Sequence, residues 1–414
     1  MIADDYFSPE ISDMTATPFH VLAKPIGPIC NLDCHYCYYL HTEDLYGRGN
    51  RWQMTDSRLE QFVRQYIESQ PLHARDVEFV WQGGEPTLLG PDFFRKAVSF
   101  QKKHVRPGMT VRNCLQTNGV LLDESWCAFL RENGFLVGLS IDGPAHLHDS
   151  YRVDRQGKST HASVVRALQL LQEERVEFNT MVCVHRANGD HGAEVYSYLR
   201  DIGCRYMQFI PIVERRGAGR HAETTGSEVQ PEVFTMNTAE EAVSTRSVLP
   251  GQFGRFLISV FDEWIRHDVG KVFVQIFDES LAMWTGMESS LCIFRRECGE
   301  SLVIEHNGDV YSCDHFVNPA HLLGNIESKN LDSLVIMPAQ QEFGRAKATT
   351  LPQYCRSCEV RFACNGECPK NRFLVTPEGA TGLNYLCEGY RSFFNHIDPT
   401  MRRMAAAIQS QAAT

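Results

Sequence analysis

The chain has 414 residues, which is long for a single hydrophobic core, so we expect at least two domains. Its formal net charge of −11 argues against a general nucleic-acid or anionic-membrane surface, because either would favour a basic face. The first residues, MIADDYFSPEISDM, contain no apolar export signal, and no stretch reaches the roughly 18 apolar residues of a membrane span. We therefore expect a cytoplasmic protein without nucleic-acid or membrane partners, whose cysteines are metal ligands or free thiols.

Six β-rich runs alternate with helical patterns between residues 20 and 213. The predicted strands are HVLAKP, VEFVWQGGE, RNCLQTNG, LVGLSIDG, EFNTMVCV and YMQFIPIV. Amphipathic segments lie between them near 56–69, 91–104, 123–133, 159–174 and 190–201. The third segment opens on Asp123, a favourable helix N-cap. Six β/α repeats predict a parallel sheet, open or curled into part of a barrel, with the chemistry at the C-terminal ends of its strands.

A cysteine triplet follows the first predicted strand in the run PICNLDCHYCYYL, at Cys30, Cys34 and Cys37. An iron–sulfur cubane needs four ligands and favours thiolates, so three local cysteines would leave one iron open to an outside ligand. A zinc knuckle, a disulfide pair and buried thiols are the alternatives. Zinc is the strongest of these, but it requires four closed ligands, and neither His35 nor His41 stands at a familiar offset.

Two other predicted strand ends carry residues suited to binding. The second strand runs into GGEP, where Gly83 and Gly84 would let a ligand approach bare backbone, although a tight turn is the alternative. The fourth strand ends at Ser140, and Arg152 follows twelve residues later. The planar guanidinium of an arginine suits a carboxylate, whereas an exposed arginine is more often a surface ion pair.

The segment from about 214 to 250 changes character. Its run GAGRHAETTGSEVQ has charge, glycine and threonine but no apolar periodicity, which predicts an exposed loop or linker. The next run, QFGRFLISVFDEWIRH, has apolar residues at helical spacing. We expect Phe256, Val260 and Ile265 to lie on its core face.

Eight further cysteines lie in the C-terminal third, enough for two fully ligated cubanes. They are Cys292, Cys298, Cys313, Cys355, Cys358, Cys364, Cys368 and Cys387. The pair CRSC and CNGEC could instead hold one or two zinc ions. Within SLVIEHNGDVYSC, Asn307 and Gly308 predict a type I′ hairpin between alternating strands, which would bring the flanking cysteines together.

The cysteine triplet resembles that of the radical S-adenosylmethionine (SAM) enzymes, and the C-terminal cysteines resemble the SPASM extension of peptide-modifying members. Nearly the whole chain, from about 17 to 400, is similar to anaerobic sulfatase-maturating enzymes. The runs that carry the resemblance are WQGGEPTLLGPDFF, LQTNGVLLD, GFLVGLSIDGP, FIPIVER, EHNGDVYSCDHFV and CEVRFACNGECPKNRF. It implies an α/β fold, a partial (β/α)6 radical SAM barrel followed by a C-terminal SPASM domain that binds two auxiliary iron–sulfur clusters.

By this resemblance the chain divides into six parts. They are an N-terminal extension (1–16), the radical SAM partial barrel (17–213), a loop or linker (214–250), a helical connector (251–291), the SPASM domain (292–390) and a C-terminal helix (391–414).

The resemblance also implies SAM and three 4Fe–4S clusters, and it assigns their ligands. The SAM cluster takes Cys30, Cys34 and Cys37; one auxiliary cluster takes Cys292, Cys298, Cys313 and Cys368; the other takes Cys355, Cys358, Cys364 and Cys387. The SAM contacts are Tyr36, Gly84, Ser140, Arg152 and Val213. By default, the remaining cysteines are buried thiols: Cys114, Cys127, Cys183 and Cys204.

The implied activity is radical SAM oxidation of a specific cysteine or serine in a sulfatase polypeptide, unfolded or nascent, to Cα-formylglycine without oxygen. The implied electron donor is a flavodoxin or ferredoxin, and the auxiliary clusters would carry the substrate electron away or position the peptide. Asp314, next to Cys313, is the expected proton acceptor, with a pKa raised by partial burial; an aspartate that merely caps the hairpin end is the alternative.

Two other functions remain open. One is a SPASM enzyme that crosslinks a ribosomal peptide. The other is a non-catalytic iron–sulfur protein for electron transfer or metal storage.

Overall fold

The computed structural model describes residues 17–46, 52–216 and 234–412. The expected N-terminal extension and the GAGRHAETTGSEVQ run of the expected linker lie outside these ranges. None of the helices in the described ranges is long and apolar enough to cross a membrane.

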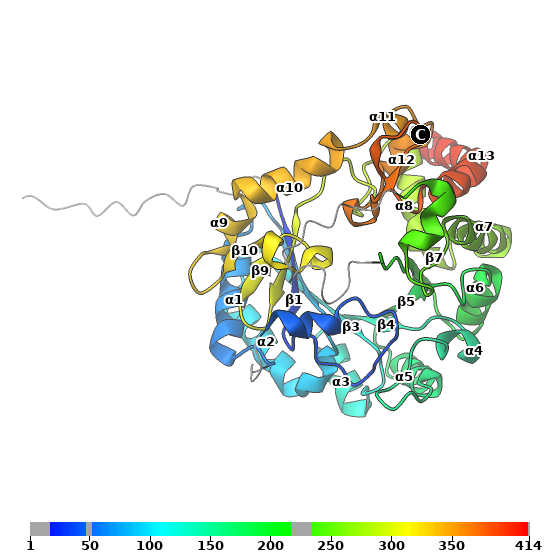
Figure 1. Cartoon of the computed structure of the whole chain (residues 1–414). Helices are drawn as coiled ribbons and strands as arrows, with labels where there is room; N and C mark the ends of the chain where they lie inside the picture. The colour runs from blue at the N-terminus through cyan, green and yellow to red at the C-terminus, as the bar shows by residue number, and fades with distance from the viewer. Residues whose placement is uncertain (1–16, 47–51, 217–233, 413–414) are drawn as a thin grey trace, which may run out of the picture.

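The six predicted strands are present and lie side by side in chain order, all parallel. They are β1 (His20–Lys24), β2 (Asp76–Trp81), β3 (Thr110–Thr117), β4 (Phe135–Ser140), β5 (Phe178–Val184) and β6 (Tyr206–Pro211). The intervening helices are α1 (Asp56–Glu68), α2 (Gly90–His104), α3 (Glu124–Glu132), α4 (Ala145–His148), α5 (His161–Glu173) and α6 (Gly192–Asp201). Figure 1 shows α1, α2, α3, α5 and α6 on the outer side of the curved sheet.

Side-chain caps fix where two of these helices begin. The Asp123 carboxylate accepts a hydrogen bond from the backbone N–H of Trp126 at 2.8 Å, as its position in the sequence predicts. Thr55 caps α1 in the same way, through the N–H of Arg58 at 3.3 Å. The buried residues of each helix then face the sheet, and the core lies between the helices and the strands.

The sheet extends beyond the six predicted strands on both sides. A short strand, β7 (Phe273–Val274), pairs with β6, and β8 (Ser301–Glu305) pairs in parallel with β1. Strands β9 (Asp309–Tyr311) and β10 (Leu322–Asn325) continue the sheet in antiparallel fashion. Lys24 and Glu305 are register partners at the C-terminal ends of β1 and β8. The chain that leads to Cys313 therefore belongs to the same sheet as the cysteine triplet.

The predicted type I′ turn between β8 and β9 is wrong. The N–H of Gly308 donates to the carbonyl of Glu305 at 2.9 Å, so His306 and Asn307 are the central residues of the turn. A type I′ turn needs positive φ at both central positions, and neither has it, whereas Gly308 has a φ of 90°. The glycine thus follows the turn as a bulge, and the hairpin itself still forms.

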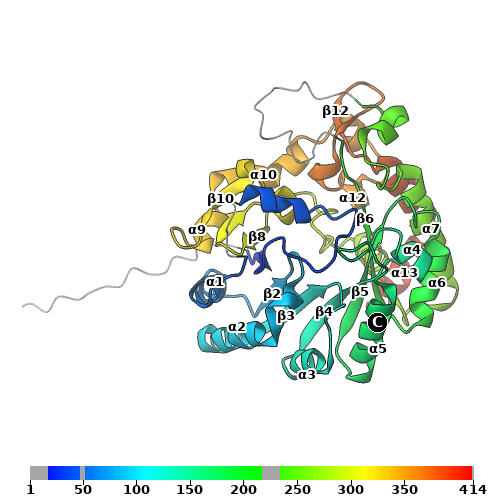
Figure 2. The same cartoon turned by 60° about the horizontal axis from the view of Figure 1, so that its bottom comes forward.

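The C-terminal part is mostly helical and packs against the end of the sheet that carries the site. Its elements are α7 (Pro250–His267), α8 (Gln275–Trp284), α9 (Leu331–Val335), α10 (Pro338–Thr349), α11 (Gln353–Arg356), α12 (Arg361–Cys364), β11 (Leu374–Val375), β12 (Thr381–Leu383) and α13 (Cys387–Ala412). In Figure 2 the segments with α10 and β12 lie above the strands, and α3 lies below them.

Helix α13 begins at Cys387 rather than at residue 391, and it packs on α7 through two glycines. A Cβ on Gly254 would lie 2.8 Å from the Cα of Gly389, so only glycine permits this approach. On α7, Phe256 and Val260 are buried and Ile265 is partly buried, as the sequence predicts. The close pairing holds α7 and α13 together, and the ring contact between Phe256 and Phe209 of β6 joins α7 to the barrel.

Candidate functional site

The cysteine triplet lies in the loop that follows β1, at the C-terminal edge of the sheet. Burial raises the pKa of both Cys30 and Cys34 to about 12, and each thiol lies within electrostatic range of Cys37. A bound metal ion would reverse this tendency, because a metal deprotonates a coordinating thiol. The side-chain amide of Asn118, at the end of β3, lies 3.8 Å from the Cys30 sulfur. The loop thus gathers three soft donors at the place where a parallel sheet presents its chemistry.

The GGEP segment after β2 packs directly on the triplet loop. The N–H of Gly84 donates to the carbonyl of Gly27 at 2.8 Å, and the N–H of Glu85 donates to that of Ile29 at 2.8 Å. A Cβ on Gly84 would lie 1.9 Å from the Ile29 oxygen. The chain's own backbone therefore requires glycine at position 84. The residue that it contacts, Ile29, immediately precedes Cys30.

Glu85 is a site residue that the sequence analysis missed, although it stands within the motif. Its carboxylate is buried and accepts hydrogen bonds from the Thr117 hydroxyl and the Asn118 N–H, both at 2.8 Å. Burial raises its pKa. The acid fixes the end of β3 beside the triplet, which explains why a glutamate follows the paired glycines.

Arg152 is buried against Asp142, a second missed residue, which lies in the predicted SIDGP run. The Asp142 carboxylate is fully buried and accepts hydrogen bonds from Arg152 Nε and the Cys183 N–H, both at 2.8 Å, and from the Tyr36 hydroxyl. Burial is the largest single influence and raises the pKa of Asp142, but the Arg152 charge, the Arg152 hydrogen bond and the neighbouring His185 and His148 together outweigh burial and leave that pKa lowered. Arg152 is only 6% exposed, so the alternative of a surface ion pair is wrong.

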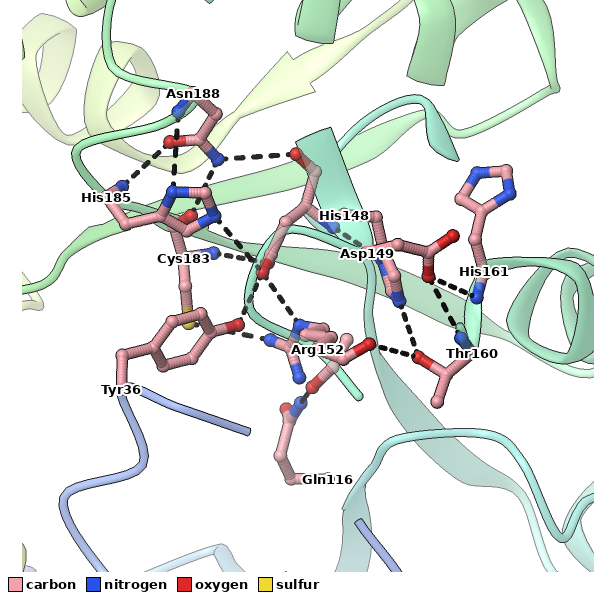
Figure 3. Close-up of polar contacts among 12 residues, drawn as sticks. Tyr36, Gln116, His148, Asp149, Arg152, Thr160, His161, Cys183, His185 and Asn188 are labelled. Carbon is pink, nitrogen blue, oxygen red and sulfur yellow. Dashed lines mark hydrogen bonds and ion pairs between the residues drawn. The ribbon is translucent and has the colours of Figure 1, made fainter. Parts of the chain in front are cut away.

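The surrounding side chains hold this pair in place (Figure 3). The His185 ring stacks on Tyr36 with a centroid distance of 5.5 Å, and its Nε2 lies 3.8 Å from the Asp142 carboxylate. Burial lowers the pKa of His185 to about 4, so the imidazole is neutral at neutral pH. The Asn188 amide donates to the Cys183 carbonyl at 2.9 Å. A buried polar network therefore fixes Arg152 relative to the triplet loop, which carries Tyr36.

The other two expected SAM contacts also lie at strand ends. Ser140 ends β4, is buried, and accepts a hydrogen bond from the Gln116 amide at 3.0 Å. Val213 follows β6 and is buried. Together with Tyr36, Gly84 and Arg152, these residues come from the end of β4 or from the loops after β1, β2, β4 and β6, so the fold gathers them at one edge of the sheet.

Asp314 pairs with Lys24, a third residue that the sequence analysis missed. The Lys24 ammonium forms an ion pair with the Asp314 carboxylate, and the Tyr38 hydroxyl donates to that carboxylate at 2.5 Å. The expected rise in the pKa of Asp314 is wrong. Burial does raise it, but the Lys24 charge and these hydrogen bonds outweigh burial, so the pKa lies below its usual range. Asp314 is therefore ionised at neutral pH.

The C-terminal cysteines form two sets. One set lines a common small cavity: Cys355, Cys358, Cys364 and Cys387. In the other set each thiol lies within electrostatic range of at least one other member: Cys292, Cys298, Cys313 and Cys368.

The four remaining cysteines differ in burial. Cys127 and Cys204 are buried, as expected, whereas Cys114 and Cys183 are half-buried. The Cys183 sulfur lies 3.5 Å from Arg152 Nη2, so this thiol belongs to the network around Asp142.

Comparison with known proteins connects this geometry to a family. Residues 25–199 match the radical SAM superfamily, and residues 292–359 match SPASM, an iron–sulfur cluster-binding domain. The chain is 44% identical, over 96% of its own length and 94% of the relative, to a serine-type anaerobic sulfatase-maturating enzyme of Bacteroides thetaiotaomicron. The chain belongs to the anaerobic sulfatase-maturating enzymes. A cysteine-type member from Clostridium perfringens is 32% identical over 95% of this chain and 100% of the relative.

Solved structures agree with this family assignment. Native anSMEcpe with bound AdoMet superimposes with a TM-score of 0.80 at 32% identity, covering 94% of this chain and 100% of that one. The same protein has been solved with AdoMet and the Cp18Cys peptide, again with a TM-score of 0.80, covering 94% of this chain and 99% of that one at 32% identity. SuiB of Streptococcus suis, at 16% identity, a TM-score of 0.56, and 86% and 74% coverage, shares the fold alone.

These findings decide several of the sequence predictions for this sulfatase-maturating family member. The radical SAM partial barrel followed by a SPASM domain is confirmed, and the chain is a radical SAM enzyme. The non-catalytic alternative is therefore wrong. SPASM is an iron–sulfur cluster-binding domain, so its match favours iron–sulfur over zinc at the C-terminal cysteines that it covers.

Proposed function

We propose that this chain oxidises a specific serine or cysteine of a sulfatase polypeptide to Cα-formylglycine without oxygen. The observation that carries the proposal is the 44% identity to a serine-type sulfatase-maturating enzyme over 96% of the chain. The site geometry supports it, because the Tyr38–Asp314 hydrogen bond joins the residue after Cys37 to the residue after Cys313. An ionised acid thus lies between the triplet loop and an auxiliary-cysteine loop.

The proposed cofactors are SAM and three 4Fe–4S clusters. The triplet would hold the SAM cluster, and the two C-terminal cysteine sets would hold one auxiliary cluster each. SAM bound to the reduced triplet cluster supplies a 5′-deoxyadenosyl radical, which abstracts a hydrogen atom from the target Cβ. The cavity lined by one set, and the soft thiolate donors of both, support this assignment.

The chain's own residues would bind and orient SAM and deprotonate the substrate radical. The buried Arg152 guanidinium, with Ser140, would bind the SAM carboxylate and ribose, while Tyr36, Gly84 and Val213 would contact the rest of SAM through backbone or packing. Asp314 would accept the proton that the substrate radical releases, because its carboxylate is ionised and stands beside a cluster ligand. That radical would also have to lose one electron, for which an auxiliary cluster would serve as the acceptor. A serine gives the aldehyde directly, whereas a cysteine gives a thioaldehyde that water hydrolyses with release of hydrogen sulfide.

A serine target is the better-supported one. The serine-type relatives from Bacteroides and Klebsiella are 44% and 37% identical to this chain, whereas the Clostridium perfringens cysteine-type relative is 32% identical. The proposed substrate is an unfolded or nascent sulfatase, the proposed reductant a flavodoxin or ferredoxin, and the proposed compartment the cytoplasm.

The test is anaerobic reconstitution with iron and sulfide, followed by SAM, dithionite and one of two matched peptides. One peptide contains Ser-x-Pro-x-Arg, the other Cys-x-Pro-x-Arg, and mass spectrometry detects the aldehyde. We expect aldehyde together with 5′-deoxyadenosine, formed faster from the serine peptide. Deoxyadenosine with both peptides unaltered would contradict the proposed substrate and favour the peptide-crosslinking alternative.

A further inference from the structure

Lys347, near the end of α10, is a buried cation beside the first auxiliary-cysteine set. Its side chain is 0% exposed, and its ammonium donates to the carbonyls of Cys292, Ile293 and Arg295 at 2.5, 2.8 and 2.5 Å. An ammonium has three N–H donors, so all three are used. Lys347 therefore fixes the backbone of the loop that carries Cys292.

Arg372 plays the corresponding part in the loop between Cys364 and Cys368. Its guanidinium donates to the carbonyls of Gly366, Asn365 and Glu367 at 2.8, 2.9 and 3.1 Å. In chain order, Asn365, Gly366 and Glu367 have φ values of 46°, 73° and 51°, so the segment is a left-handed turn. Such backbone costs of order 1–3 kcal/mol per non-glycine residue and persists only where its surroundings hold it. The guanidinium supplies that support.

The two cations belong to one framework. Arg372 Nη1 also donates to the carbonyl of Lys347 at 2.6 Å, and the Asn365 amide donates to the carbonyl of Phe294 at 2.7 Å. The left-handed turn is flanked by Cys364 of one cysteine set and Cys368 of the other. Lys347 and Arg372 thus connect the ligand loops of both sets.

Neither cation forms an ion pair with a carboxylate of the described residues. In the described part of the chain, the ion pairs within 4.0 Å include neither Lys347 nor Arg372. The nearby buried acid, Glu367, accepts hydrogen bonds from the amides of Asn371 and Asn384 instead. A buried charge without a partner costs several kcal/mol, so a negative group is expected close by.

The cysteine thiols, together with Glu367, are the groups in a position to supply that negative charge, and burial raises the pKa of Glu367 and so disfavours its charged form. Three members of the first set lie within electrostatic range of Lys347: Cys292, Cys298 and Cys368. Arg372 lies within the same range of members of both sets: Cys355, Cys364 and Cys368. A cubane with four thiolate ligands carries net negative charge, which would balance both cations.

We propose that Lys347 and Arg372 are the positive partners of the two auxiliary clusters, positioning residues that raise the reduction potentials of these clusters. A nearby positive charge stabilises the reduced cluster more than the oxidised one, because the reduced cluster carries one more negative charge. The auxiliary clusters would thereby accept the electron that the substrate radical releases. This inference rests on the proposed function, since it requires the auxiliary clusters to be present.

The test compares three variants of the reconstituted full-length enzyme by redox titration monitored by electron paramagnetic resonance, without SAM. Lys347→Met removes the charge, Lys347→Arg keeps it, and Lys103→Met removes a solvent-exposed lysine of α2 as a matched control. We expect Lys347→Met to disfavour reduction of one auxiliary cluster at least tenfold, a shift of about 59 mV for one electron. The other two variants should match the parent, and the triplet cluster should still cleave SAM in all of them.

The outcomes distinguish the effect of the Lys347 charge from the effect of its hydrogen bonds to the loop that carries Cys292. Full iron and sulfide content with an unshifted potential in Lys347→Met would overturn the proposal. If that variant loses iron, Lys347→Gln keeps two N–H donors without charge: a lowered potential supports the proposal, and an unchanged one overturns it. Loss of iron in both Lys347→Met and Lys347→Gln, with retention in Lys347→Arg, also supports a need for the charge. Loss of iron in all three Lys347 variants would overturn the proposal.

Failure of the proposed function would look different. A parent enzyme that holds iron for one cluster only would contradict the three-cluster assignment itself. A parent with three clusters that leaves the sulfatase peptides unaltered would contradict the proposed substrate, while the potential of Lys347→Met would still decide the role of the cations.

Discussion

The ammonium of Lys24 contacts the carboxylate of Asp314 across the parallel pair β1 and β8. Lys24 is 1% exposed, and its Nζ also lies 3.4 Å from the ring centroid of Tyr39. The pairing of β1 with β8 brings these two distant parts of the chain together, since Lys24 is the register partner of Glu305. The lysine holds the acid ionised at the strand ends, which is the state that a proton acceptor requires.

Asp314→Asn should separate SAM cleavage from aldehyde formation. An asparagine cannot accept the proton, so we expect aldehyde formation to fall by about two to four orders of magnitude while SAM cleavage continues. The measurement is formylglycine and 5′-deoxyadenosine in the same reaction mixture. Asp92→Asn, on the exposed face of α2, is the control and should behave like the parent. Normal aldehyde formation in Asp314→Asn would remove the proposed role of this residue.

Asp142→Asn should destabilise the enzyme and weaken its affinity for SAM. The change leaves the buried Arg152 without its charged partner, which typically costs about 3–5 kcal/mol. Arg152 then loses its fixed position, so we expect the dissociation constant for SAM to rise at least tenfold. Urea unfolding and equilibrium binding of SAM to the reconstituted enzyme check the two effects. An unchanged affinity for SAM would argue against Arg152 as a SAM contact.

Gly84→Ala should prevent assembly of the triplet cluster. The added Cβ would lie 1.9 Å from the Ile29 carbonyl oxygen, so the loop carrying Cys30 must move. We expect loss of the iron of one cluster and of SAM cleavage, with the auxiliary clusters retained, as measured by iron analysis and deoxyadenosine formation. The control is Gly251→Ala on α7, where the new Cβ meets flexible side-chain ends of Glu388 and Arg255. Full iron content and SAM cleavage in Gly84→Ala would contradict this account of the motif.

The free energy of unfolding should decrease as the pH is lowered below about 6.5. Burial lowers the pKa of both His148 and His185 to about 4 in the folded state, whereas an exposed histidine titrates near 6.5. The unfolded state therefore takes up protons first, and stability is lost as the pH falls from about 6.5 towards 4. Urea unfolding at pH 7 and pH 5 measures the difference, and His185→Gln should reduce it. An unchanged pH dependence in His185→Gln would show that His185 does not contribute.

Local patterns in the sequence were sufficient for the framework of the fold. The alternation of β-rich and amphipathic runs predicts the six parallel strands, and Asp123 predicts the start of α3, because strand periodicity and helix capping depend on neighbouring residues. The spacing of Cys30, Cys34 and Cys37 predicts the triplet loop for the same reason. Local sequence was not sufficient for the turn at Gly308, because the φ values that the hairpin adopts are not those of the expected type.

The sequence was enough to identify the candidates for the chemistry: the cysteine triplet, the eight C-terminal cysteines and the strand-end motifs. How those residues are held and charged depends on the tertiary structure. The pairing of β8 with β1 sets Lys24 against Asp314 and so reverses the expected direction of the Asp314 pKa shift. Burial against Asp142 makes Arg152 a fixed group rather than a surface one. The reason is electrostatic: a pKa depends on burial and on charges a few ångströms away in space, and those neighbours are distant along the chain.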